Sequence, residues 1–209
     1  MTPTLLHELL SLRERRIHYV GGSRPAAYYI ADREAGGVLV NAPPFDAALL
    51  AALQALAPLA YIFLPSRRGA RDLERWRTAS GAESIAFEAE APHIAGTVDL
   101  AVAGDRKLTR TIDFLPMSGV TEGSCALRIR NDGGVVFFGP ILEPGADGWP
   151  ALVVHPDDYS AENRLIGALG LQDQRFEHAF TDMFESGRTR FGPGADAAIR
   201  ERLARLLDA

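Results

Sequence analysis

Three arginines between a strand-like run and a helix-like segment are the residues of this chain whose chemistry is most specific. Arg67, Arg68 and Arg71 follow the continuous apolar run from Leu59 to Leu64. A guanidinium can bind a carboxylate or a phosphate through two parallel hydrogen bonds, and a helix N-terminus adds favourable backbone dipoles. The segment therefore predicts a site for a small anion.

The same arginines also have a simpler interpretation. Arginines in a solvated loop often pair with acids nearby, and Asp72 and Glu74 follow at once in the sequence. Asp182, in the second half of the chain, is a third acid with which one of them could pair. The sequence leaves the anion site and the paired loop as alternatives.

The five histidines show no metal-ligand spacing. We interpret most of them as surface or hydrogen-bonded side chains. His155 is the exception, because it opens the polar loop His155-Pro156-Asp157-Asp158 before a helix-like segment. Asp158 precedes Tyr159, so it is the expected N-cap of that helix. The complete set is His7, His18, His93, His155 and His178.

No nucleophile stands out from its surroundings. The single cysteine, Cys125, opens a strand-like segment without an evident base, so we expect a buried structural thiol. Thr121 and Ser124 lie in a turn-like segment, and Ser124 lacks the Gly-x-Ser-x-Gly pattern of serine hydrolases. We expect both to be turn residues.

The elements that must position these residues alternate between strands and helices. In the first half, Gly36-Gly37 predicts a tight hairpin turn and Pro43-Pro44 ends a strand. Strands are predicted at 17–22, 26–31, 37–42, 59–64 and 84–87, helices at 46–56 and 72–80, and one helical turn at 88–93.

The second half repeats this order with different lengths. Asn131-Asp132-Gly133-Gly134 predicts a hairpin turn between two of its strands. Strands are predicted at 98–102, 109–115, 125–130, 135–138 and 177–181, and helices at 159–169 and 195–207. Two runs of strands, each followed by helices, favour an α+β protein built as a four-layer αβ/βα sandwich.

Four segments, in this order, resemble the metallo-β-lactamase superfamily over residues 28–207. They are the hairpin at 28–42, the strand, loop and helix at 61–76, the turn at 114–124, and the strand Gly133 to Pro140, GGVVFFGP. The resemblance implies a metallo-β-lactamase-like sandwich. It also implies a zinc site whose metal generates a hydroxide nucleophile.

The positions that should bind this metal carry the wrong groups. Matched from the strand side, the family's His-x-His-x-Asp-His motif falls on Ser66, Arg68, Ala70 and Arg71; matched from the helix side, Arg68 and Gly69 stand at its Asp-His pair. The next histidine falls on Val120 and the bridging aspartate on Pro140. The last histidine falls on Asp182, the one position that keeps a group able to bind metal.

Bulk properties limit the other function classes. With 209 residues and 47% hydrophobic residues, we expect one domain covering residues 1–209. No apolar run approaches the roughly 20 residues that span a bilayer, and the N-terminus lacks a signal-peptide pattern. We therefore expect a cytoplasmic protein without membrane association. The net charge of −5 argues against nucleic-acid binding.

The resulting hypothesis is a member of this superfamily that has lost its metal and is not a zinc hydrolase. It would act without a cofactor by binding a small anionic ligand or a partner. The expected ligand site comprises Ser66, Arg67, Arg68, Arg71, Val120, Thr121, Pro140, His155 and Asp182. One alternative is an active hydrolase with an atypical metal or a metal-independent site, using Asp182, His155 and Asp157. Another is a structural subunit of a homodimer or of a hetero-oligomer.

Overall fold

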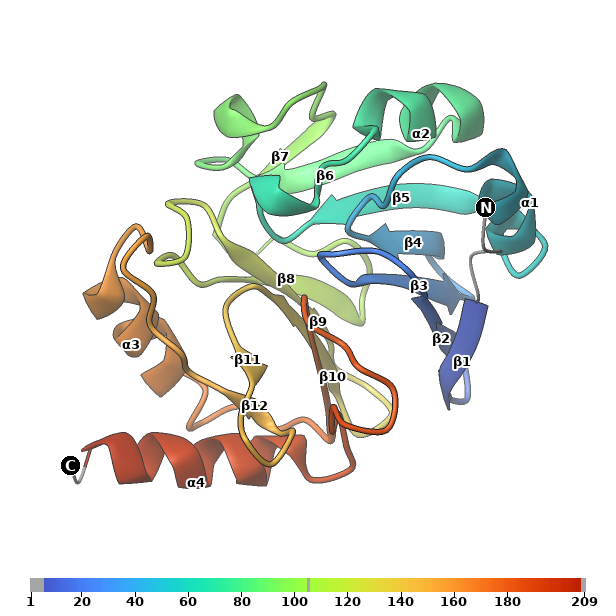
Figure 1. The fold of residues 1–209 in the computed structure, drawn as a ribbon. Helices are drawn as coiled ribbons and strands as arrows, with labels where there is room; N and C mark the ends of the chain where they lie inside the picture. The colour runs from blue at the N-terminus through green and yellow to red at the C-terminus, as the bar shows by residue number, and fades with distance from the viewer. Residues whose placement is uncertain (1–5, 105, 208–209) are drawn as a thin grey trace. The chain divides into compact units, whose positions relative to one another are not determined.

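A computed structural model describes residues 6–104 and 106–207 of the chain. The residues form two compact units, which divide between Val102 and Ala103. Each unit has its own sheet and its own helices (Figure 1). The expectation of a single domain over residues 1–209 stays a prediction.

The first unit is built on a seven-stranded sheet whose strands lie side by side in chain order. Strands β1 to β4 pair antiparallel, and β4 to β7 pair parallel. The strands are β1 Leu6–Ser11, β2 Arg15–Val20, β3 Ala27–Asp32, β4 Gly36–Val40, β5 Leu59–Leu64, β6 Glu83–Phe87 and β7 Leu100–Val102. All but β1 correspond to strands that the sequence predicts.

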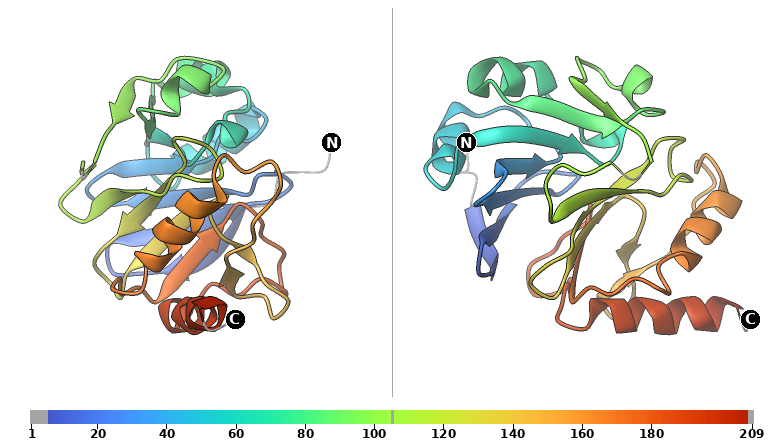
Figure 2. Two further views of the ribbon diagram at one scale, coloured as in Figure 1. Left: turned by 90° about the vertical axis from the view of Figure 1, so that its left-hand side faces the viewer. Right: turned by 180° about the vertical axis from the view of Figure 1, so that it is seen from behind.

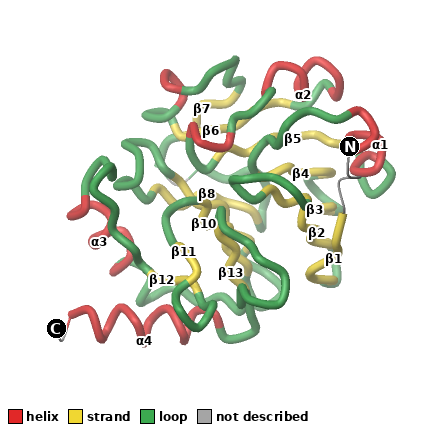
Figure 3. The backbone as a smooth tube through the Cα atoms, in the orientation of Figure 1, coloured by secondary structure: helices red, strands yellow, loops and turns green. Residues whose placement is uncertain are grey.

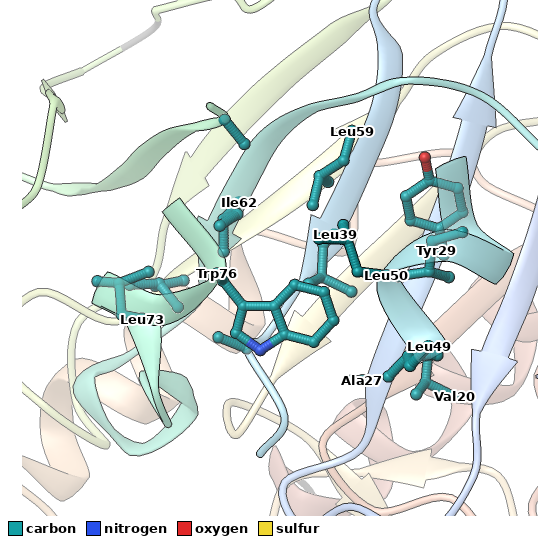
Figure 4. Packing of buried hydrophobic residues seen from close by; sticks show 14 of the residues in the cluster. Val20, Ala27, Tyr29, Leu39, Leu49, Leu50, Leu59, Ile62, Leu73 and Trp76 are labelled. Carbon is teal, nitrogen blue, oxygen red and sulfur yellow. The ribbon is translucent and has the colours of Figure 1, made fainter. Parts of the chain in front are cut away.

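Helices α1 (Ala47–Gln54) and α2 (Leu73–Ser80) pack on one face of this sheet. Figure 4 shows Leu50 of α1 next to Leu39 of β4, and Trp76 of α2 next to Ile62 of β5. Alternate residues of a strand point to the same face, so each strand contributes every second side chain to this core. The packing fixes where α2 begins, and so where the loop between β5 and α2 ends.

Helix α2 is also attached to the far edge of the sheet by charged groups. Arg77 binds the Asp99 carboxylate through two nitrogens, and Ser84 donates its N–H and its hydroxyl to the same carboxylate at 2.8 Å each. The Arg77 guanidinium holds the pKa of Asp99 well below its usual range, against the opposing effect of burial. Asp99 therefore remains ionised as a fixed partner for α2.

The turn before β4 differs from the prediction. The sequence predicts a turn at Gly36-Gly37, whereas the chain turns one step earlier, at residues 33–35, and Gly36 opens β4 with a φ of 77°. The cause is Asp32, whose Oδ1 accepts the N–H groups of Glu34 and Ala35 at 2.8 Å each. An aspartate that hydrogen-bonds the backbone just after it commonly forms such a turn.

The second unit contains a four-stranded sheet with the order β13-β10-β9-β8. Strand β10 pairs parallel with β13 and antiparallel with β9. The strands are β8 Ile112–Pro116, β9 Cys125–Ile129, β10 Val135–Gly139 and β13 His178–Thr181. Between β10 and the next helix the chain is mostly loop (Figure 3), and it includes the short hairpin of β11 (Glu143–Pro144) and β12 (Pro150–Ala151).

Helices α3 (Ala161–Leu169) and α4 (Ala195–Leu207) complete the second unit. Ala168 of α3 and Ile199 and Leu203 of α4 belong to one core with Val136 and Phe138 of β10. The right-hand view in Figure 2 shows α4 as the long helix beneath this sheet. This arrangement holds the loops that follow β10 and β13, where several of the expected site residues lie.

Candidate functional site

The loop between β5 and α2 has a backbone that buried polar groups hold in place. Ser66 is buried, and its Oγ accepts the N–H of Arg68 at 3.3 Å. Glu90 is fully buried, and its Oε1 accepts the N–H of Arg67 at 2.6 Å. A buried carboxyl oxygen that accepts a backbone N–H fixes this part of the backbone, because both polar groups are then paired inside the protein. These hydrogen bonds fix the backbone conformation of the loop at Arg67 and Arg68.

The same loop is also joined to the segment that follows β4. Ala42 donates its N–H to Gly69 O at 2.7 Å, and Arg71 donates its N–H to Ala42 O at 3.2 Å. A Cβ atom added to Gly69 would lie 1.8 Å from Oδ1 of Asn41. Glycine is therefore the residue that allows this close approach.

The three arginines of the loop direct their side chains away from these internal contacts. Arg67, Arg68 and Arg71 are all exposed, unlike Ser66 before them. Within the part of the chain that the structure describes, the Arg67 and Arg71 guanidiniums have no hydrogen-bond or ion-pair partner. Two cations on a fixed backbone are consequently available to a ligand.

One of the two alternatives, the pairing of these arginines with Asp72 or Glu74, is not observed in the described residues, where both carboxylates contact other groups. Asp72 accepts the N–H of Phe45 at 3.0 Å and lies 3.7 Å from an Arg75 nitrogen. Glu74 accepts a bond of 2.8 Å from Arg77 and a further one from the Thr97 N–H. A pair with Asp182, which lies in the second unit, stays a prediction.

In the second unit, Val120 and Thr121 lie in the turn between β8 and β9. Both are buried, and the Val120 side chain offers no atom that could bind a metal or donate a hydrogen bond. Ser124 donates its hydroxyl to Met117 O at 2.8 Å. Thr121 and Ser124 are therefore turn residues, as predicted. Cys125 is likewise buried, and burial raises the pKa of its thiol far above the usual range.

The structure brings Pro140 and Asp182 together. They directly follow β10 and β13, neighbouring parallel strands in which Gly139 is opposite Thr181. The N–H of Asp182 donates to Gly139 O at 2.8 Å. Parallel strands end at the same edge of a sheet, so the sequence predicts this neighbourhood correctly. Proline contributes no donor or metal ligand there, and the Asp182 carboxylate is nearly buried.

His155 is part of a connected polar network. Its Nε2 lies 2.7 Å from Oε1 of Glu143, and its N–H donates to Oδ2 of Asp158 at 2.7 Å. Asp158 Oδ2 also accepts 2.6 Å from Arg164, a buried arginine of α3 that donates to Ile141 O at 2.7 Å. His155 is thus held both at its backbone and at its ring.

The role expected of Asp158 is wrong. Ser160 is the N-cap of α3, and its Oγ accepts the Asn163 N–H at 3.1 Å. Burial acts to raise the pKa of Asp158, but the hydrogen bonds from His155 and Arg164 outweigh it and keep this pKa below its ordinary value. Asp158 is therefore an ionised partner of Arg164 instead of a helix cap.

Sequence reasoning missed Glu143 and Arg164. Arg164 lies four residues before Ala168, so both fall on the buried face of α3. A charged residue on an otherwise buried helix face was the signal that could have indicated an internal ion pair. For Glu143 we find no local signal, because its partner His155 comes from a separate loop.

Comparison with known proteins identifies the fold. No family model matches the sequence, and no curated protein matches it. Among solved structures, a metallo-β-lactamase from Pontibacter korlensis has a TM-score of 0.72 at 14% identity, over 98% of this chain and 100% of that one. The subclass B3 metallo-β-lactamase BJP-1 of Bradyrhizobium japonicum has a TM-score of 0.65 at 16% identity, over 98% and 94%.

The chain has the metallo-β-lactamase fold. A Cronobacter sakazakii metallo-β-lactamase with a HARLDQ motif is a further match, at a TM-score of 0.66 and 14% identity over 92% of this chain and 90% of that one. The predicted fold class, an α+β metallo-β-lactamase-like sandwich, is confirmed.

The residues that the sequence resemblance places at the metal positions do not fit a catalytic zinc. Such a site needs about three protein ligands in ordered geometry. A buried valine, a proline and exposed arginines supply none, and Asp182 supplies one carboxylate. Across residues 6–104 and 106–207, no three His, Cys, Asp or Glu side chains form a group that could hold a metal ion.

The expected site residues belong to both units. Ser66, Arg67, Arg68 and Arg71 are in the first, and Val120, Thr121, Pro140, His155 and Asp182 are in the second. Their joint membership of one ligand site stays a prediction. In the described part of the chain, no helix has the length and apolar character required to cross a membrane.

Proposed function

We propose that this metallo-β-lactamase-fold protein works without a metal and binds a small anionic ligand through Arg67 and Arg71, with Arg68 beside them. One observation carries the proposal. The guanidiniums of Arg67 and Arg71 are exposed and have no partner in the described residues, although their backbone is fixed by Ser66 and the buried Glu90.

The chemistry of arginine defines the ligand class. Guanidinium groups bind carboxylates and phosphates through paired, charge-assisted hydrogen bonds, each worth about 1.5–3 kcal/mol. A backbone held in advance lowers the entropy lost when a ligand binds. A carboxylate or a phosphate monoester of small size is therefore the expected ligand.

A titration followed by amide NMR tests this proposal. Inorganic phosphate and acetate are added at low salt, and saturable shifts are expected at the amides of residues 66–71. Arg67→Ala/Arg71→Ala should abolish them. Arg205→Ala is the matched control, since Arg205 is an exposed arginine already paired with Glu201. Retention of the shifts in the double variant would exclude these arginines as the site.

Metal analysis of the purified protein tests the other half of the proposal. We expect no stoichiometric metal, because the described residues contain no ligand group for it. Zinc, iron or manganese at one equivalent per chain would overturn the metal-free proposal and favour an atypical metallohydrolase.

A second function, metal-independent hydrolysis, is favoured by the Glu143–His155 pair. When Nε2 carries its hydrogen, the Glu143 carboxylate accepts it, and Nδ1 retains a lone pair. Nδ1 has no hydrogen-bond partner among the described residues. A histidine oriented by a carboxylate in this way can act as a general base that takes a proton from an attacking water.

Hydrolysis assays separate this function from ligand binding. If the pair is catalytic, Glu143→Gln and His155→Gln should each lower kcat on a responsive ester or phosphoester by roughly 10²–10⁴-fold. His93→Gln, at an exposed histidine, is the control. Absence of turnover on any ester, or turnover that both variants retain, would exclude the pair as a catalytic site.

A further inference from the structure

A hollow of about 360 Å³ lies at the end of the first unit where the β1–β2 turn meets the β3–β4 turn. Arginines form much of its lining, together with apolar residues that precede β5. The lining includes Arg13, Arg15, Arg16, Arg33, Leu56 and Ala57. The molecule has a net charge of −5, so this grouping of cations runs against its overall charge.

A buried ion pair belongs to the lining of the hollow. Arg15 Nε lies 2.9 Å from Asp32 Oδ2, and both side chains are 1% exposed. The other oxygen of Asp32 accepts the N–H groups of Glu34 and Ala35. The charge of Asp32 is thereby matched inside the protein, and it does not neutralise the arginines at the rim.

Backbone hydrogen bonds join the two turns that make the walls. Leu12 donates its N–H to Arg15 O at 2.9 Å within the first turn, and Arg33 donates its N–H to Glu14 O at 3.0 Å between the two turns. Arg15 also lies directly opposite Asp32 in the β2–β3 pairing. The positions from which the rim arginines extend are therefore set by the sheet.

The rim carries excess positive charge. Arg13, Arg16 and Arg33 are exposed and line the hollow, and their guanidiniums have no partner within the described residues. Glu14 is the one exposed acid among the lining residues. A single carboxylate carries one negative charge and can bind one guanidinium through two hydrogen bonds. Linked phosphates carry several negative charges and many acceptor oxygens, so they match a group of guanidiniums better.

We propose that this hollow is a second anion site, which takes a small ligand with two or more linked phosphate groups. It is separate from the arginine loop at 66–71. That loop follows the carboxyl end of β5, whereas Leu56 and Ala57 precede its amino end, and a strand of this length spans roughly 20 Å. The proposal therefore does not depend on the proposed function.

Amide NMR with inorganic pyrophosphate as the probe tests the site. Saturable shifts are expected at residues 12–16 and 32–35, and the affinity should fall as salt is added. Arg13→Ala/Arg33→Ala should weaken pyrophosphate by roughly 100-fold, about tenfold for each lost charge-assisted contact. Arg67→Ala/Arg71→Ala should leave these shifts unchanged, which separates this site from the proposed one.

The milder variant Arg13→Lys/Arg33→Lys provides a test in case Arg13→Ala/Arg33→Ala does not fold. It keeps the charge but removes the paired hydrogen bonds, so an intermediate affinity is expected, with the amide spectrum otherwise intact. The proposal is overturned if pyrophosphate causes no saturable shift at residues 12–16 and 32–35. It is equally overturned if folded Arg13→Ala/Arg33→Ala binds pyrophosphate as tightly as the unmodified protein.

Discussion

A single buried arginine connects three segments of the second unit. Arg164 pairs with Asp158 and donates to Ile141 O, and its side chain packs so tightly on Gly119 that a Cβ there would lie 2.3 Å from Arg164 Cγ. Gly119 adjoins Val120, and Ile141 follows Pro140, two positions that the family resemblance assigns to metal ligands. Within this unit, the Arg164 guanidinium joins the segments next to these two positions.

Removal of this arginine should be costly. Arg164→Ala leaves the Asp158 carboxylate buried without its cation, and loss of one partner of a buried pair typically costs about 3–5 kcal/mol. Urea unfolding at neutral pH measures the change. Arg188→Ala is the control, because the Arg188–Glu185 pair is exposed and should contribute about 0–1 kcal/mol. Equal effects of the two substitutions would contradict a structural role for Arg164.

At the scale of elements, the contact between Gly69 and Asn41 determines how the arginine loop sits beside the segment after β4. Asn41 is buried and donates Nδ2–H to Ala26 O at 2.8 Å, so its side chain cannot move aside freely. Gly69→Ala should therefore destabilise the protein by about 1–3 kcal/mol, the usual cost of overpacking. It should also weaken phosphate binding at residues 66–71. Thermal unfolding and the NMR titration measure the two effects.

A helical glycine provides the control for that substitution. A Cβ on Gly167 would meet its nearest neighbour, Met117, at an ordinary 3.7 Å. Gly167 lies in α3, where alanine is favoured over glycine by up to about 1 kcal/mol. Gly167→Ala should be neutral or stabilising. If Gly69→Ala were equally harmless, the loop would not depend on the close approach to Asn41.

Elements with strong periodicity or clear boundaries could be predicted from the sequence. The strand at 59–64 and the helix at 195–207 agree with β5 and α4 to the residue. Strand β1 was missed because its pairing with β2 shifts between Glu8 and Leu10, which breaks the alternation that identifies a strand. The turn at 33–35 depends on one side chain, Asp32. The sequence prediction placed the turn at Gly36-Gly37 instead, because paired glycines are a stronger local turn signal.

Within the second unit, the sequence could predict that Pro140 and Asp182 lie close together, because they follow β10 and β13, which are neighbours in the sheet. The partners of the charged groups could not be predicted in this way. Glu74 pairs with Arg77, and Asp158 pairs with Arg164 and does not cap a helix. Such pairings depend on which side chains meet in space, and a local pattern contains no information on that.

At the scale of the whole molecule, each unit has a buried histidine, His18 in the first unit and His178 in the second. The ring Nδ1 of each has no hydrogen-bond partner among the described residues. Burial lowers the pKa of both. Glu8 opposes this at His18 and Glu177 opposes it at His178, but neither reverses the shift. The folded protein therefore holds both rings neutral at a pH where the unfolded chain begins to protonate them.

This difference in proton binding predicts acid sensitivity with a definite sign. Below about pH 6.5, the ordinary histidine pKa, the unfolded chain binds more protons than the folded one, so the free energy of unfolding falls as the pH falls. Its slope should approach about 1.4 kcal/mol per pH unit for each histidine until the lowered pKa is reached. Urea unfolding at pH 7.5, 6.5 and 5.5 measures it.

His18→Gln and His178→Gln should each reduce the slope, and His93→Gln, at an exposed position, should not. Stability that is constant over this range, or that rises toward acid, would show that burial of these rings does not control their protonation.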